Sequence, residues 1–503
     1  MLDSNIPLLA RVSTYGQRVA LYSNEQQYTY ATLYTEALQI AYQLCAQGLK
    51  PGGCVLHWAL ADATYVSTQW GIWLAGGIAV PVSTSYPLPE ITYLATDSQA
   101  HHFILPDALL AQFEALKDAN PDIQLLSFES LLGNPMLHPP SLPEVSAQAP
   151  ALMIYTSGTT GKPKGVVSTH QIIAKQIQTL VTAWAWQADD CILLPLPLHH
   201  IHGLINVLCS ALWVGAQVVM MPKFEAQSVY RALSSGRYTL FMAVPTIYHR
   251  LLATHAEADI AAQTAFAQAC RQMRLMVSGS AALPVQVLEA WEKLSGHTLL
   301  ERYGMTEIGM ALSNPLQGVR KAGTVGLPLP EVRVRLVDEQ GTPIEAWGEP
   351  GEIQVQSPCL FVAYWQKPEA TAASFTPDGW FQTGDIAERD AEGYYRILGR
   401  KSTDIIKSGG YKISALEIEE VLRQHPLIAD CAVVGLPDVA MGERIAVAYV
   451  PRSVADTLSL EALRDWAKTK LAPYKIPVLL SCCEELPRNA MGKVLKKAVK
   501  ELF

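Results

Sequence analysis

Apolar strands alternate with amphipathic helices over roughly the first 310 residues of this 503-residue chain. Residues 30–47 place apolar side chains at helical spacing, and residues 77–82 form a short apolar run typical of a buried strand. The pattern continues with a predicted helix near 204–213 and predicted strands at 191–194, 217–221, 239–244 and 274–277. Such alternation predicts α/β layers built on largely parallel sheets.

After about residue 323 the pattern changes to short β segments separated by Gly and Pro, at 332–337, 351–356 and 394–398. Beyond a junction at 399–404, the apolar segments 405–407 and 411–413 flank Ser408-Gly409-Gly410 and predict a hairpin. Ser414 and Glu417 fit a capping box that opens a helix through Arg423. We therefore predict an α/β fold with two domains. Residues 1–400 form a large N-terminal domain of layered sheets with a β-rich subdomain, and residues 401–503 form a small, mobile α+β C-terminal domain.

Composition narrows the class of protein. Half of the residues are hydrophobic and 17% are charged, as in a well-packed globular enzyme, and the net charge of −8 disfavours nucleic acid as a partner. After residue 400, Lys and Arg slightly outnumber Asp and Glu. The nine cysteines show no CxxC spacing and no signal peptide is evident, so we expect reduced cysteines and a cytoplasmic location. Polar residues interrupt the apolar segment Leu204–Met221, which favours a buried helix and strand over a membrane span.

A segment rich in glycine and hydroxyl side chains, Tyr155–Val166, directly follows the apolar run 151–154. Its small residues allow close approach of backbone N–H groups to an anion, and its hydroxyls and lysines add donors and charge. The segment differs from the P-loop of common NTPases, because only two residues separate Gly158 from Gly161 and Pro163 follows Lys162. A phosphate-binding loop is the favoured interpretation, and a flexible surface loop is the alternative.

Four further clusters follow in order: Arg274–Ala281, Glu301–Glu307, Gly379–Asp385 and Pro487–Lys493. With the glycine-rich segment they resemble the acyl-adenylate-forming superfamily, which includes acyl-CoA synthetases, peptide-synthetase adenylation domains and luciferases. The resemblance covers essentially the whole chain. It implies an enzyme that joins a carboxylic acid to ATP, releases pyrophosphate, and then transfers the acyl group to a thiol.

The resemblance also implies a role for each matching residue. The β- and γ-phosphates would be held by Thr156, Ser157, Gly158, Thr159, Thr160, Gly161 and Lys162. Glu307 would bind Mg²⁺, for which a hard oxygen donor is suitable. Thr306 would contact the α-phosphate. The nucleoside would be held by Gly279, Ser280, Ala281, Tyr303, Gly304, Asp385 and Arg400.

Lys493 matches the family's C-terminal lysine, which implies that it neutralises charge between the attacking carboxylate and the α-phosphate. Lys496, Lys497 and Lys500 are interpreted as ordinary surface lysines. In the family the C-terminal domain rotates between the two half-reactions. The segment 399–404 matches the hinge, although Ser402 stands where relatives often carry Asp or Lys. Ser408, Gly409 and Gly410 would line the path of the CoA thiol.

Three histidines lie within Leu196–Gly203, but their spacing does not make a convincing zinc site. The resemblance implies that His200 lies at the mouth of the acyl pocket, whereas His199 and His202 pack or orient. The sequences around residues 198–203, 274–284 and 301–307 resemble the malonyl-CoA synthetase subgroup. A dicarboxylic acid needs a partner for its second carboxylate, and an arginine fork suits that group. Arg274 and Arg302 are the candidates, with Ser278 nearby; the alternative for Arg274 is a structural ion pair.

We therefore predict an ATP-dependent ligase for malonate, with methylmalonate as a possible second acid, that uses ATP and CoA as co-substrates and Mg²⁺ as cofactor. A CoA ligase for a short monocarboxylic or aryl acid, or an enzyme that loads a carrier protein, are alternatives within the same class. A non-enzymatic ATP-binding module is disfavoured, because Lys493, Glu307 and Asp385 are all present. The sequence does not specify the oligomeric state.

Overall fold

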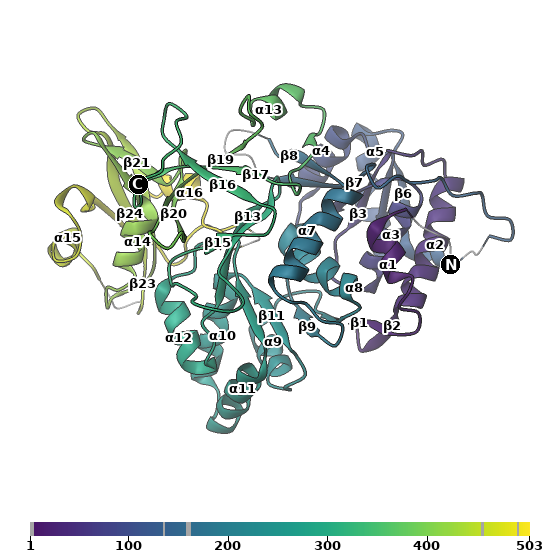
Figure 1. The fold of residues 1–503 in the computed structure, drawn as a ribbon, viewed down its shortest axis with the longest axis horizontal. Helices are drawn as coiled ribbons and strands as arrows, with labels where there is room; N and C mark the ends of the chain where they lie inside the picture. The colour runs from purple at the N-terminus through teal and green to yellow at the C-terminus, as the bar shows by residue number, and fades with distance from the viewer. Residues whose placement is uncertain (1–4, 134–135, 157–161, 454–456, 490–491) are drawn as a thin grey trace.

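The computed structural model describes residues 5–133, 136–156, 162–453, 457–489 and 492–503. Ser157, Gly158, Thr159, Thr160 and Gly161, which we predicted to hold phosphates, lie outside the described residues. Figure 1 shows α1 at one end of the long axis and the chain from β21 onward at the other.

A seven-stranded sheet forms one layer of the N-terminal part. Its strands, in spatial order, are β18 (Ala363–Tyr364), β8 (Lys164–Thr169), β7 (Pro150–Thr156), β4 (Ile78–Val82), β3 (Cys54–Trp58), β5 (His102–Leu105) and β6 (Gln124–Ser127). The pairs from β7 through β6 are parallel, and β8 and β18 add antiparallel strands at one edge. Every residue of β4 is buried, as expected for a strand covered on both faces.

A nine-stranded sheet forms the second layer. Its strands, in spatial order, are β15 (Leu327–Pro328), β14 (Gly309–Ser313), β13 (Leu300–Met305), β12 (Leu275–Ser278), β11 (Leu240–Ala243), β9 (Cys191–Leu194), β10 (Gln217–Met220), β1 (Val19–Ser23) and β2 (Gln26–Thr29). The strands from β13 to β1 run parallel. The carboxyl ends of β12 and β13 therefore lie at the same edge, and this edge carries the candidate site.

Helices α2 (Tyr30–Ala46), α3 (Ala63–Leu74) and α7 (His170–Ala183) begin at Thr29, Asp62 and Thr169, whose side chains accept a backbone N–H of the first turn. Helix α3 contacts β3 and β4 of one sheet and β1 of the other, so it lies between the two layers. The remaining helices up to residue 372 are α1 (Pro7–Val12), α4 (Leu88–Ser98), η1 (Asp107–Phe113), α5 (Leu116–Ala119), α6 (Phe128–Gly133), η2 (His202–Cys209), α8 (Ser210–Val214), α9 (Ala226–Leu233), α10 (Pro245–Glu257), α11 (Ile260–Gln272), α12 (Val285–Ser295) and α13 (Pro368–Ala372).

The apolar segment Leu204–Met221 forms the π-helix η2, the short helix α8 and strand β10. The helix predicted near 204–213 thus begins earlier and is π-helical over its first part, a geometry often found at functional sites. Among the described residues, no helix is both long enough and apolar enough to cross a bilayer.

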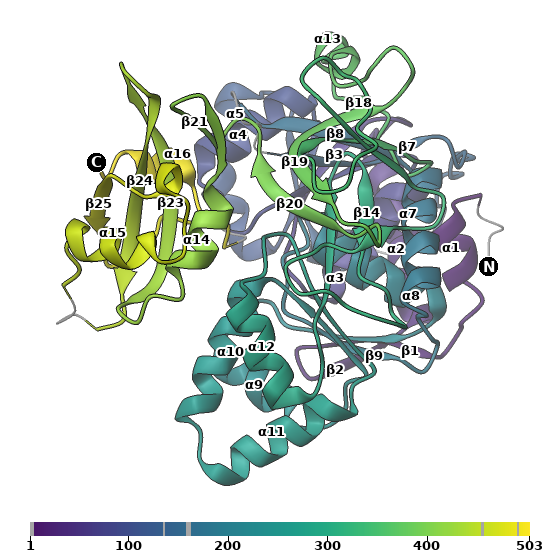
Figure 2. The ribbon, with the colours of Figure 1, turned by 60° about the vertical axis from the view of Figure 1, so that its left-hand side comes forward.

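A four-stranded antiparallel sheet follows, with the order β16 (Arg333–Val337), β17 (Gly351–Gln356), β19 (Phe381–Arg389) and β20 (Tyr395–Arg400). Figure 2 shows β19 and β20 between the N-terminal layers and the C-terminal end of the chain. The change to short β segments after residue 323 is therefore confirmed as a separate β-rich sheet.

The chain from Ile405 onward, called here the C-terminal unit, has its own five-stranded sheet. It contains β21 (Ile405–Ser408), β22 (Tyr411–Ser414), α14 (Ala415–Leu422), β23 (Ile428–Asp438), β24 (Gly442–Pro451), α15 (Leu460–Lys468), η3 (Pro473–Lys475), β25 (Leu479–Cys482) and α16 (Lys496–Lys500). Gly409 and Gly410 have φ of 56° and 83° in the turn of the predicted hairpin. Ser414 accepts the Glu417 N–H at 3.1 Å, as predicted.

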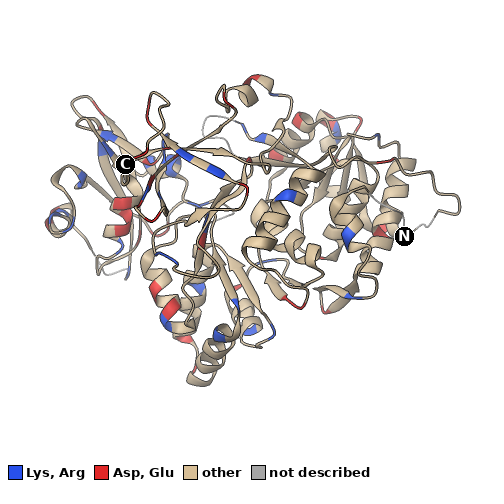
Figure 3. Ribbon diagram, viewed as in Figure 1, with Lys and Arg blue, Asp and Glu red and all other residues tan. Residues whose placement is uncertain are grey.

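The predicted fold class is confirmed: layered α/β sheets, a β-rich sheet and a small α+β unit. Figure 3 shows both signs of charge on the C-terminal unit, so its slight excess of positive charge does not form one basic face in this view.

Candidate active site

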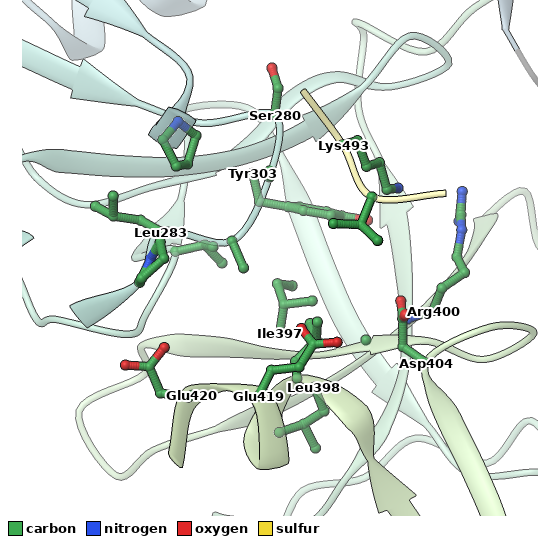
Figure 4. A pocket seen from close by; sticks show the side chains of 18 of the residues that line it. Ser280, Leu283, Tyr303, Ile397, Leu398, Arg400, Asp404, Glu419, Glu420 and Lys493 are labelled. Atoms are coloured by element: carbon green, nitrogen blue, oxygen red, sulfur yellow. The ribbon is translucent and has the colours of Figure 1, made fainter. Parts of the chain in front are cut away.

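A cleft of about 2190 Å³ opens where the carboxyl edge of β12 and β13 meets the four-stranded sheet and the C-terminal unit. Figure 4 shows Ser280, Leu283 and Tyr303 of the N-terminal layers facing Glu419 and Glu420 of α14. Residues far apart in the sequence therefore line one cleft, and several of them belong to the clusters singled out from the sequence.

Tyr303, Asp385 and Arg400 form a connected polar group in this cleft. The Tyr303 hydroxyl donates to Asp385 Oδ2 at 2.5 Å, and Arg400 Nη1 lies 3.2 Å from Asp385 Oδ1. Burial raises the pKa of the Asp385 carboxyl, and the positive charge of Arg400 offsets part of that rise. Strand β13 thus brings Tyr303 to Asp385 of β19, 82 positions later, and to Arg400 of β20. The aromatic ring and the carboxylate are suited to a nucleoside.

The loop after β12 places Ser280 and Ala281 in the same cleft, whereas the preceding Gly279 lines neither this cleft nor the adjoining smaller one. The Ser280 hydroxyl lies 3.1 Å from His202 Nδ1, and the Ser280 backbone has φ of 73°. Gly279 packs directly on Arg302, because a Cβ there would lie 2.6 Å from the guanidinium carbon. Gly304 is equally close to its neighbours, since a Cβ would lie 2.2 Å from the Gly309 carbonyl oxygen. Gly279 therefore permits close packing on Arg302, and Gly304 permits close packing of β13 on β14.

Arg302 is the most unusual side chain of the site. It is buried, and its Nε and Nη2 have no hydrogen-bond partner among the described residues. Burial lowers the pKa of Arg302 to about 10, so its guanidinium is still charged at neutral pH. A buried donor without a partner carries a free-energy cost that an anionic ligand would remove. Arg302 lines this cleft and also a second, smaller cleft that adjoins it.

Two histidines accompany Arg302. Burial lowers the pKa of His200 to about 4, and burial followed by the charge of Arg302 holds the pKa of His202 well below its usual value. Both imidazoles are therefore neutral at pH 7 and leave Arg302 as the positive group. Ser278, at the end of β12, is buried with a hydroxyl that has no partner in the described part of the chain. His200 and His202 both line the cleft, and the place of His200 at the mouth of an acyl pocket stays a prediction.

Arg274 does not lie in the site. It precedes β12 and lies at the end opposite Ser278, where its Nε is 2.8 Å from Asp190 Oδ1 and its Nη1 donates to the Trp184 carbonyl at 3.0 Å. It lines neither cleft. The interpretation of Arg274 as an acid anchor is therefore corrected to the alternative, a structural ion pair, because the strand's alternation gives the face of a side chain but not the end of the strand at which the ligand binds.

A second cleft, of about 520 Å³, adjoins the first and contains Thr156, Thr306 and Glu307. Glu307 is buried and its Oε1 accepts the Tyr364 hydroxyl at 3.0 Å; burial raises the pKa of this carboxyl. Lys164 Nζ lies 4.7 Å from the centre of the Tyr364 ring and lines the same cleft. Lys164 was not among the predicted residues, although it belongs to the same glycine-rich segment.

A cluster around Asp97 of α4 holds the ends of that segment and was also missed. Asp97 Oδ2 accepts the Tyr155 hydroxyl at 2.8 Å, and Asp97 Oδ1 pairs with Lys367 Nζ at 2.9 Å. The Tyr93 hydroxyl donates to the Pro163 carbonyl at 2.7 Å, and Lys162 Nζ lies 5.2 Å from the centre of the Tyr93 ring. No local sequence pattern indicates a role for Asp97, because an acidic residue on an amphipathic helix such as α4 is ordinary.

Lys493 lines the larger cleft and is exposed. Figure 4 shows its side chain reaching toward the same region as Tyr303 and Arg400, and its charge is close enough to lower the pKa of Asp385. Its backbone exchanges hydrogen bonds with Asn489. The preceding Gly492 packs on α10, since a Cβ there would lie 2.8 Å from Thr246 Oγ1.

Ser408 ends β21, and Gly409 and Gly410 form the turn to β22; all three line neither cleft in this arrangement. The Gly409 N–H donates to the Met441 carbonyl at 2.9 Å. Their predicted contact with a thiol path stays a prediction. In the described residues, no group of three His, Cys, Asp or Glu side chains is arranged to hold a metal ion by itself.

Comparison with known proteins agrees with this geometry. Residues 8–365 match the model of the AMP-binding enzyme family, and residues 417–493 match the model of the AMP-binding enzyme C-terminal domain. The chain is 43% identical over 543 residues to a protein of Homo sapiens named malonate–CoA ligase, mitochondrial, covering 100% of this chain and 92% of the relative.

Two solved structures are informative together. ATP-bound MatB from Rhodopseudomonas palustris is 30% identical and has a TM-score of 0.91, covering 99% of this chain and 98% of that chain. A malonyl-CoA ligase ternary product complex with methylmalonyl-CoA and AMP is 37% identical but has a TM-score of only 0.68, covering 96% and 100%. The relative with the higher sequence identity thus has the lower structural similarity.

Proposed function

This chain belongs to the AMP-binding enzyme family, and from that premise we propose that it joins malonate to coenzyme A in an ATP-dependent reaction, with methylmalonate as a second acid. The class is that of an AMP-forming acid–CoA ligase. Names of relatives that include malonate–CoA ligase, and the methylmalonyl-CoA held by one structural neighbour, support this choice of acids.

The single observation that carries the proposal is that the buried guanidinium of Arg302 has two donor atoms without a partner among the described residues. A monocarboxylic acid would leave the two free donors of this buried guanidinium without partners. A malonate whose first carboxylate faces the nucleotide would present its second carboxylate to them. The neutral His200 and His202 add hydrogen-bonding groups without competing charge. We assign Ser278 and His200 to the same acyl pocket.

The nucleotide is proposed to lie along the two clefts. Tyr303 stacks on adenine beside Gly279, Ser280, Ala281 and Gly304, and Asp385 accepts the ribose hydroxyls with support from Arg400. Thr156, Lys162 and Thr306 contact the phosphates. Lys164 joins this group, because it lines the phosphate side of the cleft.

Mg²⁺ is proposed to bind at Glu307. Mg²⁺ prefers hard oxygen ligands and commonly binds through one or two carboxylates together with substrate phosphates. The buried Glu307 carboxylate, oriented by Tyr364, is suited to that role. When bound, Mg²⁺ would supply positive charge against the phosphates that leave.

Lys493 is proposed to act in the first half-reaction only. A malonate oxygen attacks the α-phosphorus, a new O–P bond forms, and the bond to pyrophosphate breaks. The ammonium group neutralises charge between the two anionic reactants and so stabilises the transition state. In the second half-reaction the CoA thiol loses its proton, its sulfur attacks the acyl carbon, and AMP leaves.

We further propose that the described arrangement is the adenylating one and that residues 401–503 rotate on residues 1–400 before thioester formation. The higher TM-score with an ATP-bound relative than with a product complex supports this assignment. Ser408, Gly409 and Gly410 would then reach the thiol path only after the rotation. The hinge is proposed to lie within Gly399–Asp404.

A substrate panel tests the proposal. Thioester and AMP formation are measured with malonate, methylmalonate, acetate, butyrate and benzoate, with CoA or with a carrier protein as acceptor. We expect malonate and CoA to give the highest kcat/KM. Preferential turnover of butyrate or benzoate would contradict the dicarboxylate assignment, and transfer to a carrier protein alone would contradict the CoA assignment.

The predicted cytoplasmic location stays a prediction, because the human, mouse and cow relatives are named as mitochondrial. Fractionation of cells that produce this chain would test it.

A further inference from the structure

The C-terminal unit touches the N-terminal layers through a carboxylate of α14. Glu420 Oε1 accepts the backbone N–H of Val285, the first residue of α12, at 3.1 Å. Next to it, Gln286 Nε2 donates to the Arg423 carbonyl at 3.3 Å. Figure 4 shows Glu420 beneath Leu283, at the wall of the cleft that also contains Lys493.

Helix α12 lacks a side-chain cap of its own. The residue before it is Pro284, which makes no capping hydrogen bond. The first N–H groups of a helix have no partner within the helix, and a carboxylate placed there is favoured by both the hydrogen bond and the helix dipole. Glu420 therefore supplies from the C-terminal unit the cap that the local sequence does not supply.

The same short connection also faces the substrate cleft. It runs from β12 to α12 and includes Ser280, which is bonded to His202. On its inner side, Glu301 Oε1 accepts the Leu283 N–H at 3.2 Å, and Glu301 directly precedes Arg302. The connection between the two elements is therefore held by the carboxyl group of Glu301 from the core and by the carboxylate of Glu420 from the C-terminal unit.

Other contacts across this boundary are of different kinds. Lys412 and Glu339 form an ion pair of 2.6 Å, but both side chains are more than half exposed, where such pairs contribute little. Gly492 meets Thr246 by packing alone. Glu420 is less exposed, and its bond is charge-assisted and ends on a fixed backbone group.

We propose that Glu420 is a positioning residue for adenylation, which holds the C-terminal unit in the orientation that puts Lys493 into the cleft. This inference rests on the proposed function, because it assumes that Lys493 serves the first half-reaction. When the unit rotates away, the first turn of α12 loses its cap. The contact therefore biases the enzyme toward the adenylating arrangement between turnovers.

The test separates the two half-reactions. Adenylation is followed by malonate-dependent pyrophosphate release in a single turnover, and thioester formation by the reaction of supplied malonyl-AMP with CoA. Glu420→Ala removes the acceptor and Val285→Pro removes the donor, and proline is well tolerated at the first position of a helix. We expect each variant to slow adenylation by about ten-fold or more, the lower end of the effect of losing one hydrogen bond to a charged group, and to leave thioester formation within about two-fold.

The two changes act on one bond, so the double variant is expected to be no slower than either single variant. Glu417→Gln is the matched control, because Glu417 lies on the same helix but pairs with Lys475 inside the C-terminal unit. It should leave the ratio of the two rates unchanged. Equal slowing of both half-reactions by Glu420→Ala, or an unchanged ratio, would overturn the proposal.

A second readout does not depend on the acid. Amide hydrogen exchange at Val285 in the intact, substrate-free protein should be about ten-fold faster in Glu420→Ala than in the wild type or in Glu417→Gln. Unchanged exchange would overturn the proposal. If the wild type shows no malonate-dependent adenylation, the proposed function fails, and the exchange rates still decide whether Glu420 makes this contact.

Discussion

The residues that we propose to bind the nucleotide and the lysine that we propose for adenylation are positioned in the cleft by different means. Tyr303, Asp385 and Arg400 come from three strands, are largely buried, and bond to one another. Lys493 is exposed, and its backbone N–H donates to Asn489 Oδ1 of the same C-terminal unit. It lines the cleft because this unit lies against the N-terminal layers. The groups that we propose to hold the nucleotide in both half-reactions thus lie on largely buried strands, whereas the group proposed for one half-reaction is an exposed side chain of the C-terminal unit.

The largest effect expected from this contrast is on Lys493. Lys493→Ala should slow adenylation by about 10²- to 10³-fold, the range found when one preorganised charge-stabilising donor is removed, and should spare thioester formation from supplied malonyl-AMP. Single-turnover measurements of both steps check this. Lys497→Ala, an exposed lysine near the same terminus, is the control. Equal slowing of adenylation and thioester formation in Lys493→Ala would contradict the assignment of this lysine to one half-reaction.

The buried Arg302 should determine the preference for malonate over a monocarboxylic acid. Arg302→Met should lower kcat/KM for malonate by about 10²-fold, because the second carboxylate loses its partner, and should lower that for butyrate much less. Arg274→Met is the comparison: it breaks the pair with Asp190 and should lower the melting temperature without changing the ratio of the two acids. If both variants changed the malonate-to-butyrate ratio equally, Arg302 would not be the acid-reading residue.

Asp97 should give a smaller effect that is confined to ATP. Asp97→Asn weakens the bonds to Tyr155 and Lys367 at the base of the glycine-rich segment. We expect the KM for ATP to rise about five-fold with kcat nearly unchanged, since one partly buried charged contact is lost. Steady-state kinetics with ATP and with malonate varied separately provide the measurement. Asp118→Asn, at an exposed position of α5, serves as control, and an equal rise in the KM for malonate would argue against the assignment.

The smallest expected effect concerns Glu301, the residue of β13 whose carboxyl group accepts the Leu283 N–H. Burial raises the pKa of Glu301 to about 8 from its usual value near 4.5, so the folded state holds this proton more tightly than the unfolded chain. The stability from Glu301 is therefore complete below about pH 4.5 and is lost as the pH rises through 8. Glu301→Gln keeps the acceptor for Leu283 and cannot ionise.

The melting temperature of Glu301→Gln minus that of the wild type should accordingly rise by ~2–4 °C between pH 5 and pH 8.5. Glu289→Gln, on the exposed side of α12, should show no such gain. A constant difference between Glu301→Gln and the wild type across this pH range would mean that Glu301 does not titrate there.

Local chemistry explains what could be predicted from the sequence. Strands β9 and β17 have the predicted bounds because each is a short run whose limits are set by neighbouring turns or prolines, and the hairpin at 405–414 follows from two glycines. The site residues that were predicted carry a side-chain type matched to one substrate group, such as Asp385 or Glu307.

The rest depends on contacts between distant segments. The cap on α12 comes from Glu420, 135 positions away, and the partner of Arg274 is Asp190, 84 positions before it. The alternation of β12 could not reveal that Arg274 lies at the wrong end of the strand. Neither could it reveal that Arg302 would be left with unsatisfied donors, which is the feature on which our proposal for the acid pocket rests.

The central claim, that malonate is activated as an adenylate before CoA takes part, is tested most directly by ATP–pyrophosphate exchange in the absence of CoA. Labelled pyrophosphate should enter ATP when malonate is present, and far more slowly with butyrate, because the first half-reaction is reversible and needs no thiol. Exchange that appears only after CoA is added, or accumulation of ADP and phosphate in place of AMP and pyrophosphate, would contradict the account.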